Sequence, residues 1–164
     1  MLSLTSPGRL ITGIDYDSDK IKIAQNCAIK NDHITFTAGD IIELNFDKSD
    51  IFILNDVLHY MPVNMQIQTI EKCIKSLTDN GMIIIRDADT SLRKRHLGTI
   101  ITELLSTNLG FNKKQFNLEF VSRDVIQDLA DSHLLSLKII DQSKRTSNLV
   151  YILRKNTASS QLTY

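Results

Sequence analysis

Apolar residues recur along the chain with two alternating periods. Short runs rich in Ile, Val and Leu are typical of β-strands, and segments with an apolar residue at every third or fourth position are typical of helices that bury one face. The predicted strands are residues 9–15, 34–38, 50–55, 82–85, 135–141 and 148–154. The predicted helices begin near Asp17, Pro62, Leu97 and Ser122. Strands that alternate with helices predict an α/β fold.

Two of these segments indicate how the sheet is built. Residues 50–55 (DIFILN) are almost all apolar, which is typical of a strand covered on both faces, so we expect this strand at or near the centre of a parallel sheet. The last two runs are separated by a polar turn near residues 143–147 and predict an antiparallel hairpin. The whole pattern predicts a doubly wound, mostly parallel sheet with one reversed strand at its end.

Polar residues predict where the helices begin and end. Asp17 or Ser18 can cap the amino end of the first long helix, and Ser122 can cap the last one. The helix that begins near Pro62 is expected to run to about Leu77, with a stop at Asp79-Asn80-Gly81, where Gly81 is available for a positive φ.

The composition fits one globular domain. The chain has 164 residues, of which 42% are hydrophobic and 23% charged, and we expect a domain over residues 1–155 and a flexible tail over residues 156–164. Lys and Arg total 19, as do Asp and Glu, so the net charge is 0 and we expect no nucleic acid partner. No apolar run approaches the roughly 20 residues of a membrane span, and no secretory signal begins the chain. We therefore expect a cytoplasmic protein.

The cysteines and histidines do not predict a metal site. Cys27 and Cys73 fall within predicted helices, which favours buried free thiols in a reducing compartment over a disulfide. The four histidines show no pair at helical ligand spacing and no cysteine nearby. They are His33, His59, His96 and His133.

Four segments resemble a known family. They are GIDYD at residues 13–17, AGD at 38–40, DIFILNDVLHYMP at 50–62 and GMIIIRDAD at 81–89. In this order they resemble the successive motifs of class I S-adenosylmethionine-dependent methyltransferases, over roughly residues 10–154. Residues 93–113 and 141–155 also resemble the methyltransferase module at the carboxyl end of bacteroidete proteins that carry a transporter-like and an acyltransferase part.

The resemblance implies a Rossmann-like sheet and an S-adenosylmethionine site at its carboxyl edge. In the family, an acidic residue at the position of Asp15 binds the ribose, and the next residue, here Tyr16, lies against the adenine. Asp40, which follows Gly39, would accept a hydrogen bond from the adenine amino group, with Ile41 beside the base. From the residues alone, Asp15 and Asp40 are also compatible with turn formation.

The resemblance assigns the methyl-transfer end to residues after the third predicted strand. Asn55 and Asp56 would contact the methionyl part of the cofactor, although either residue could instead cap a helix or form a turn. His59 and Tyr60 would lie beside the reacting methyl group. An imidazole titrates at about pH 6.5, which suits proton removal from an acceptor, but His59 could equally be a wall residue.

A basic run at residues 93–95 allows two interpretations. It is typical of a solvated helix start, and it could also clamp a carboxylate or phosphate of the acceptor.

One motif of the family is missing from the 164 residues. Members begin with a strand at the centre of the sheet and a glycine-rich loop, whereas the six glycines of this chain include no GxG. They are Gly8, Gly13, Gly39, Gly81, Gly98 and Gly110. The sequence resembles a methyltransferase domain without its first strand, which leaves the strands at residues 10–15 and 51–55 with unpaired edges. Either these two strands pair directly, or an upstream segment or a partner chain completes the sheet.

The predicted function is S-adenosylmethionine-dependent methyl transfer to a small, apolar or aromatic acceptor, within a larger protein. One alternative is a non-catalytic remnant or interaction module of the same fold, which the missing loop favours. A second is a nicotinamide-dependent dehydrogenase, but that class requires a GxGxxG turn before the acidic strand end.

Overall fold

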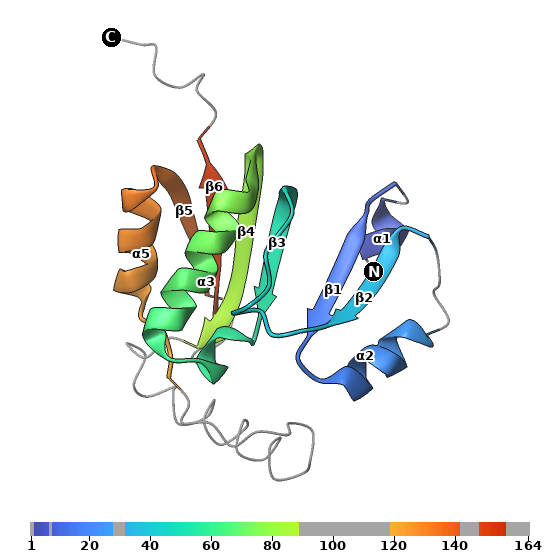
Figure 1. Ribbon diagram of the computed structural model, residues 1–164. Coiled ribbons are helices and arrows are strands. Elements are labelled where there is room, and N and C mark those ends of the chain that lie inside the picture. The colour runs from blue at the N-terminus through green and yellow to red at the C-terminus, as the bar shows by residue number, and fades with distance from the viewer. Residues whose placement is uncertain (1, 7, 28–31, 89–118, 142–147, 157–164) are drawn as a thin grey trace. The chain divides into compact units, whose positions relative to one another are not determined.

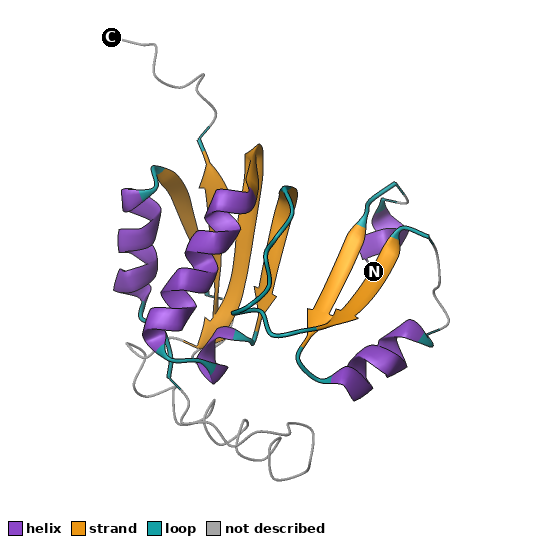
Figure 2. Cartoon of the chain, in the orientation of Figure 1, coloured by secondary structure: helices purple, strands orange, loops and turns teal. Residues whose placement is uncertain are grey.

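The computed structural model describes residues 2–6, 8–27, 32–88, 119–141 and 148–156. The chain divides into two compact units, Met1–Asn45 and Phe46–Tyr164. Figures 1 and 2 show the helices and strands of each unit. Strands and helices alternate in both units, so the α/β class predicted from the sequence is confirmed.

The first unit is built around one pair of parallel strands. Its elements are α1 (Leu2–Thr5), β1 (Ile11–Asp15), α2 (Ser18–Gln25) and β2 (Ile34–Ala38). The register places Ile11 opposite Ile34 and Asp15 opposite Ala38. Parallel strands need a crossover connection, and α2 provides it. The side chain of Asp17 caps α2 by accepting a hydrogen bond from the backbone N–H of Asp19, as the sequence predicted.

The second unit contains a four-stranded sheet. Its elements are β3 (Ser49–Asn55), the 3-10 helix η1 (Leu58–Tyr60), α3 (Val63–Ser76), β4 (Leu77–Ala88), α5 (Arg123–Ser132), β5 (Leu135–Ile140) and β6 (Asn148–Lys155). The strand order is β3-β4-β6-β5. β3 and β4 are parallel, whereas β6 is antiparallel to both of its neighbours. The predicted carboxyl-terminal hairpin is therefore confirmed.

One face of this sheet forms the core of the second unit. Figure 1 shows α3 and α5 on the same side of the sheet. On that side Ile83 is opposite Leu153 and Ile85 is opposite Tyr151, and all four side chains are fully buried. From the helices, Ile70 and Cys73 of α3 and Ile126 and Ala130 of α5 are equally inaccessible. The apolar stripes that predicted these two helices are the residues that cover the sheet.

The expectation that residues 50–55 form a central strand is wrong for the sheet that the structure describes. β3 lies at its edge, with β4 as its neighbour among the described strands. Leu54 is buried, but the side chains of Ile51 and Ile53 are 44% and 49% exposed. An apolar strand is typical of burial on both faces, and β3 is covered on one face by described residues.

The helix ends where it is expected, near Leu77, but the expected turn at residues 79–81 is wrong. α3 ends at Ser76 and β4 begins directly at Leu77, so Gly81 lies within a strand and does not take a positive φ. A Cβ atom at Gly81 would lie 3.1 Å from the carbonyl oxygen of Asp50 and 2.8 Å from Leu77 Cδ2. The glycine therefore permits close approach of β3 to β4 rather than a turn.

The two cysteines differ in their surroundings. Neither forms a disulfide. Cys73 is buried in α3, and burial raises the pKa of its thiol to about 12. Cys27 lies just beyond α2 and is exposed, so the expectation that both thiols are buried is correct for Cys73 and wrong for Cys27.

Four sequence predictions fall outside the described residues. They are the helix near residues 97–105, the basic run at residues 93–95, the polar turn near residues 143–147 and, except for residue 156, the tail at residues 156–164. Within the described part of the chain, no helix is both long and apolar enough to cross a membrane.

Candidate functional site

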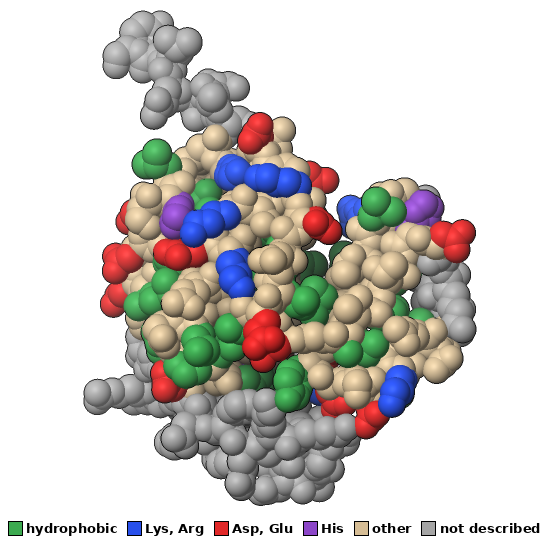
Figure 3. All heavy atoms as spheres, in the orientation of Figure 1, with side chains coloured by type: hydrophobic (Ala, Val, Ile, Leu, Met, Phe, Trp, Pro, Cys, Tyr) green, Lys and Arg blue, Asp and Glu red, His purple; other side chains and the backbone are tan. Residues whose placement is uncertain are grey.

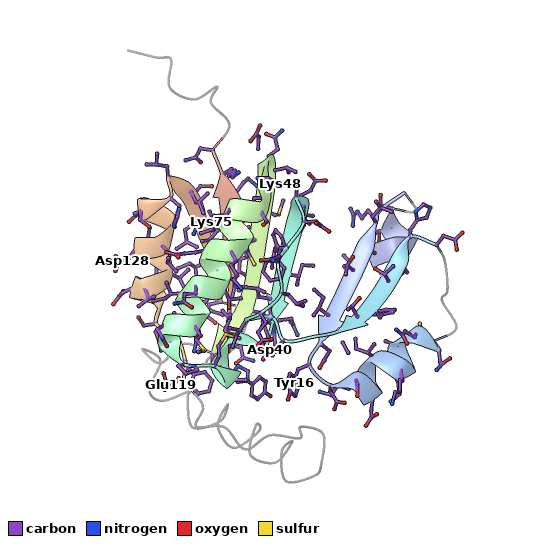
Figure 4. All side chains as sticks on the ribbon, in the orientation of Figure 1. Tyr16, Asp40, Lys48, Lys75, Glu119 and Asp128 are labelled. Atoms are coloured by element: carbon purple, nitrogen blue, oxygen red, sulfur yellow. The ribbon has the colours of Figure 1, made fainter. Side chains whose placement is uncertain are left out.

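In the first unit, two acidic residues lie at the carboxyl end of the parallel strands. Asp15 ends β1, and Asp40 follows β2 by two residues. The backbone N–H of Gly39 donates a hydrogen bond to the carbonyl oxygen of Asp15 at 3.0 Å, which holds the two segments side by side. Figure 4 shows Tyr16 and Asp40 beside this end of the strands. We expect the strand ends that bear Asp15, Asp40 and Asn55 to share one edge of a single sheet, and this is confirmed for Asp15 and Asp40. The described strands form two sheets, and Asn55 ends a strand of the other one, so the single sheet is not found.

Asp15 and Asp40 each form a local turn, and the two turns are of the same kind. Oδ1 of Asp15 accepts a hydrogen bond from the N–H of Asp17 at 2.8 Å, and Oδ1 of Asp40 accepts one from the N–H of Ile42 at 2.9 Å. Each carboxylate oxygen has two lone pairs, so both side chains keep acceptor capacity after forming the turn. Both residues are half-buried. Turn formation and ligand binding are therefore compatible in the same carboxylate.

Beside these carboxylates lie the aromatic ring of Tyr16 and the backbone of Gly39, which has little space around it. The side chain of Tyr16 is 58% exposed, whereas Ile41 is half-buried. A Cβ atom at Gly39 would lie 3.0 Å from Leu44 Cδ1, so the glycine leaves room for Leu44 to pack. An exposed ring next to two carboxylates can stack on a flat base while the carboxylates accept its hydrogen bonds.

In the second unit, the carboxyl ends of β3 and β4 are joined by a charged pair. Asp56 has a φ of 52°, in the left-handed region that Asp tolerates better than most residues. Its carboxylate pairs with the guanidinium of Arg86 and accepts a hydrogen bond from Asn55 Nδ2 at 3.1 Å. Its N–H donates to the carbonyl oxygen of Arg86 at 2.8 Å. Asp56 therefore presents an ion pair to a ligand rather than a lone carboxylate.

His59 and Asp87 form a buried pair of titratable side chains in the second unit. His59 Nδ1 lies 2.6 Å from Asp87 Oδ1, with the side chains 5% and 2% exposed. Asp87 Oδ2 also accepts hydrogen bonds from the N–H groups of Leu58 and His59, at 3.1 and 3.3 Å. An ionised carboxylate can only accept, so the proton of a neutral His59 lies on Nδ1 and its basic lone pair on Nε2.

Aromatic rings enclose the imidazole. The ring of His59 lies 4.3 Å from that of Tyr60 and stacks on that of Phe120 at 5.3 Å, measured between centroids. The segment that carries Phe120 is held by hydrogen bonds. Glu119 N–H donates to the carbonyl oxygen of His59 at 3.2 Å, and Gln66 Nε2 donates to the carbonyl oxygen of Glu119 at 2.7 Å. Figure 4 shows Glu119 near the amino end of α3.

Sequence reasoning missed the role of Asp87. The strand period carries the signal, because Ile83, Ile85 and Asp87 alternate along β4 and all three point to the buried face. A carboxylate in phase with a buried apolar row must find donors there, and η1 and His59 supply them. Glu119 and Phe120 follow an undescribed segment, and no local pattern links them to His59.

The predicted site residues fall into two groups. The first unit holds Asp15, Tyr16, Gly39, Asp40 and Ile41, and the second holds Asn55, Asp56 and His59. Within the described residues, no three His, Cys, Asp or Glu side chains are grouped as metal ligands. Figure 3 shows basic and acidic side chains interspersed on the visible face.

The geometry defines an α/β protein with polar groups at the carboxyl ends of its parallel strands, and solved structures share this fold. Human N-acetylserotonin methyltransferase, solved with S-adenosylmethionine, covers 94% of this chain with a TM-score of 0.64 and 20% identity, over 43% of its own length. The N-methyltransferase NodS of Bradyrhizobium japonicum, solved with S-adenosylhomocysteine, has the same TM-score and coverage of this chain at 18% identity, over 71% of its length. The fold is therefore that of a methyltransferase.

Residues 2–108 match a family described as methyltransferase domain. This is more than half of the chain, which therefore belongs to that family. Carboxy-S-adenosyl-L-methionine synthase of Ruthia magnifica subsp. Calyptogena magnifica is 32% identical over 78 residues, which are 47% of this chain and 33% of that protein. The chain thus spans about a third of the length of this curated relative.

The buried Asp87 carboxylate should be essential for the stability of the second unit. Asp87→Ala leaves the N–H groups of Leu58 and His59 and the imidazole without their acceptor, so we expect a loss of about 3–5 kcal/mol in the free energy of unfolding. Urea denaturation measures it. The control is Asp128→Ala on the exposed face of α5, which should change stability by less than about 0.5 kcal/mol. Equal losses in the two variants would contradict the role given to Asp87.

Proposed function

We propose that this chain transfers a methyl group from S-adenosylmethionine to a small, apolar or aromatic acceptor in the cytoplasm, as part of a larger protein. The family match carries the reaction class. The observation that carries the cofactor is the pair of half-buried carboxylates, Asp15 and Asp40, beside the exposed ring of Tyr16. Relatives of the same fold were solved with S-adenosylmethionine or S-adenosylhomocysteine.

The residues of the first unit fit the nucleoside part of this cofactor. The carboxylate of Asp15 retains lone pairs for the two ribose hydroxyls after its turn is formed, and that of Asp40 retains them for an adenine amino group. The ring of Tyr16 is exposed for stacking, and Ile41 can pack beside the base. Asn55, next to the Asp56–Arg86 ion pair, would contact the methionyl part.

The cofactor supplies an already activated methyl group, so the protein has to bind and align two reactants rather than create a nucleophile. When the acceptor is a hydroxyl, His59 Nε2 would take the proton that the acceptor oxygen loses. The carboxylate of Asp87 holds the proton on Nδ1 and stabilises the imidazolium that results. The rings of Tyr60 and Phe120 cover the imidazole, which favours an apolar or aromatic acceptor.

We base the larger-protein context on the glycine-rich loop, which the resemblance implies for the methionyl end and which the 164 residues do not contain. The experiments below therefore use two proteins: the 164-residue chain, and a version extended upstream to include a glycine-rich loop. We expect the 164-residue chain to bind S-adenosylmethionine weakly or not at all.

The cofactor assignment is tested at Asp15. In the extended chain, Asp15→Ala removes hydrogen bonds from a charged acceptor to the ribose, so affinity for S-adenosylmethionine should fall by about tenfold to a few hundredfold. Calorimetric titration measures it. Asp32→Ala changes an exposed carboxylate near the opposite end of β2 and should leave affinity unchanged. A large drop in melting temperature of the Asp15 variant, with unchanged affinity, would make Asp15 purely structural and favour a non-catalytic module.

The role of His59 is tested by transfer of a radiolabelled methyl group to a panel of small phenols and alcohols. In the extended chain, His59→Ala should lower the rate by about a hundredfold to ten-thousandfold, because it removes the imidazole that Asp87 holds in place to take the proton. Affinity for S-adenosylmethionine should stay the same. His133→Ala, at the carboxyl end of α5, is the control. Full activity of the His59 variant would leave the imidazole as a wall residue.

A further inference from the structure

Gln66 is a polar residue on the buried face of α3. It lies one helical turn before Ile70 and two turns before Cys73, so it belongs to the row of α3 residues that is buried, and it is itself fully inaccessible. Burial of an amide without hydrogen bonds costs free energy. Gln66 therefore needs partners within the fold, and the identity of these partners indicates its role.

The amide of Gln66 bridges two segments that are far apart in the sequence. Its Nε2 donates to the carbonyl oxygen of Met61 at 2.9 Å and to that of Glu119 at 2.7 Å. Carbonyl oxygens only accept hydrogen bonds, so the nitrogen of the amide must point at them. The other end, Oε1, is buried and accepts no hydrogen bond from the part of the chain that the structure describes. The orientation of the side chain is thus set by its two donor hydrogens.

The two bridged segments carry the rings that contact the imidazole of His59. Met61 directly follows Tyr60, and Glu119 directly precedes Phe120. The rings of Tyr60 and Phe120 lie 4.3 and 5.3 Å from the imidazole, measured between centroids. A single buried amide therefore ties together the backbone beside both rings.

Glu119 is the residue through which the backbone of Phe120 is held. Its N–H donates to the carbonyl oxygen of His59 at 3.2 Å, and its Oε2 accepts a hydrogen bond from the N–H of Val63, the first residue of α3, at 3.0 Å. Figure 4 shows Glu119 beside this end of α3. The carboxylate contact is exposed to water, whereas the amide of Gln66 is fully buried. Water can replace the exposed contact more easily than the buried one, so Gln66 should contribute most to holding this segment.

We propose that Gln66 is a positioning residue for His59. By holding the backbone of Glu119, it keeps the ring of Phe120 stacked on the imidazole. The two rings are inclined by 24°, and Phe120 is 8% exposed, so the stack covers one face of the imidazole. This inference rests on the proposed function for its purpose, because an imidazole of fixed orientation is what proton transfer from an acceptor requires. The stack itself needs no cofactor.

NMR of the 164-residue chain without cofactor tests the positioning. The ring current of Phe120 changes the chemical shifts of the carbon-bound imidazole protons of His59, so Phe120→Leu gives the shifts of an imidazole without the stacked ring. Gln66→Met keeps a long unbranched side chain and removes both donors, and we expect it to move the His59 resonances most of the way to the Phe120→Leu values.

The control is Gln127→Met, the same substitution on the exposed side of α5, which should leave the His59 resonances unchanged. The backbone amides of β6 report whether the second unit stays folded in each variant. Unchanged His59 resonances in a folded Gln66→Met protein would overturn the proposal.

A double variant shows whether Gln66 acts through Phe120. In the background of Phe120→Leu, Gln66→Met should cause no further change in the His59 shifts, because the ring that it positions is already absent. A change as large as in the single variant would mean that Gln66 affects His59 by another route, and would overturn the proposal.

Hydrogen exchange in the unaltered chain decides the matter if Gln66→Met does not fold. The side-chain amide of Gln66 and the backbone N–H of Glu119 are released by the same separation of the two segments, so we expect similar protection at both, at least about tenfold. The exposed side-chain amide of Gln127 is the reference for rapid exchange. Exchange at Gln66 as fast as at Gln127 would overturn the proposal.

The catalytic consequence is read in the extended chain with the same panel of phenols and alcohols. Gln66→Met should lower the rate of methyl transfer by about tenfold to a hundredfold through misplacement of the imidazole, with unchanged affinity for S-adenosylmethionine. Gln127→Met should keep the full rate. Full activity of Gln66→Met despite shifted His59 resonances would overturn the positioning role. Absence of transfer by every form would contradict the proposed function and leave the NMR result on the stack standing.

Discussion

Parallel pairing of strands is the constraint on which the candidate site depends. Neighbouring parallel strands end at the same edge, so the residues that follow them meet without any direct attraction between their side chains. In the first unit this brings Asp40 to the end of β1, where Gly39 is hydrogen-bonded to Asp15. In the second unit it brings Arg86 and Asp87 of β4 beside the residues that follow β3. The polar side chains of the candidate site lie together at these ends because the paired parallel strands end there.

The two ends differ in how their carboxylates are used. The carboxylates of Asp15 and Asp40 each accept one hydrogen bond that forms a local turn, and both residues are half-buried. Their remaining lone pairs can therefore accept hydrogen bonds from a ligand. The side chain of Asp87 is 2% exposed and accepts hydrogen bonds from three backbone N–H groups and from an imidazole. Burial of an ionised group is costly unless such partners are present. The carboxylates of Asp15 and Asp40 are suited to binding a ligand, and that of Asp87 is suited to positioning the imidazole of His59.

Much of this arrangement could be predicted from residue patterns. Apolar residues at every second position located the described strands, and apolar residues at every third or fourth position located α2, α3 and α5. Asp17 and Ser122 were correctly predicted to cap α2 and α5. The apolar pattern of β3 alone predicted a central strand, whereas the missing first strand of the family predicted the unpaired edge that β3 has among the described strands. The role of Gly81 could not be predicted from its pattern, because a glycine can form a turn or permit two strands to approach closely. The position of the Asp50 carbonyl in the folded chain decides between the two.

The candidate site was predictable where it is local and less so where it is not. Asp15 and Asp40 each belong to a short motif at a strand end, so their positions followed from the order of elements. The partner of His59 lies 28 residues away along the chain, and Phe120 packs on its ring from beyond an undescribed segment. Such contacts depend on tertiary packing, which a single sequence does not display.

The most direct test of the central claim, that cofactor binds at the carboxyl ends of the parallel strands, is an NMR titration of the isotope-labelled extended chain with S-adenosylhomocysteine. The account predicts that the largest shifts fall on the backbone amides of Asp15, Gly39 and Asp40 in the first unit and of Asn55 and Asp56 in the second. In the 164-residue chain we expect the same residues to show smaller shifts or none. Shifts centred on the amino ends of the strands, or none in either form, would contradict it.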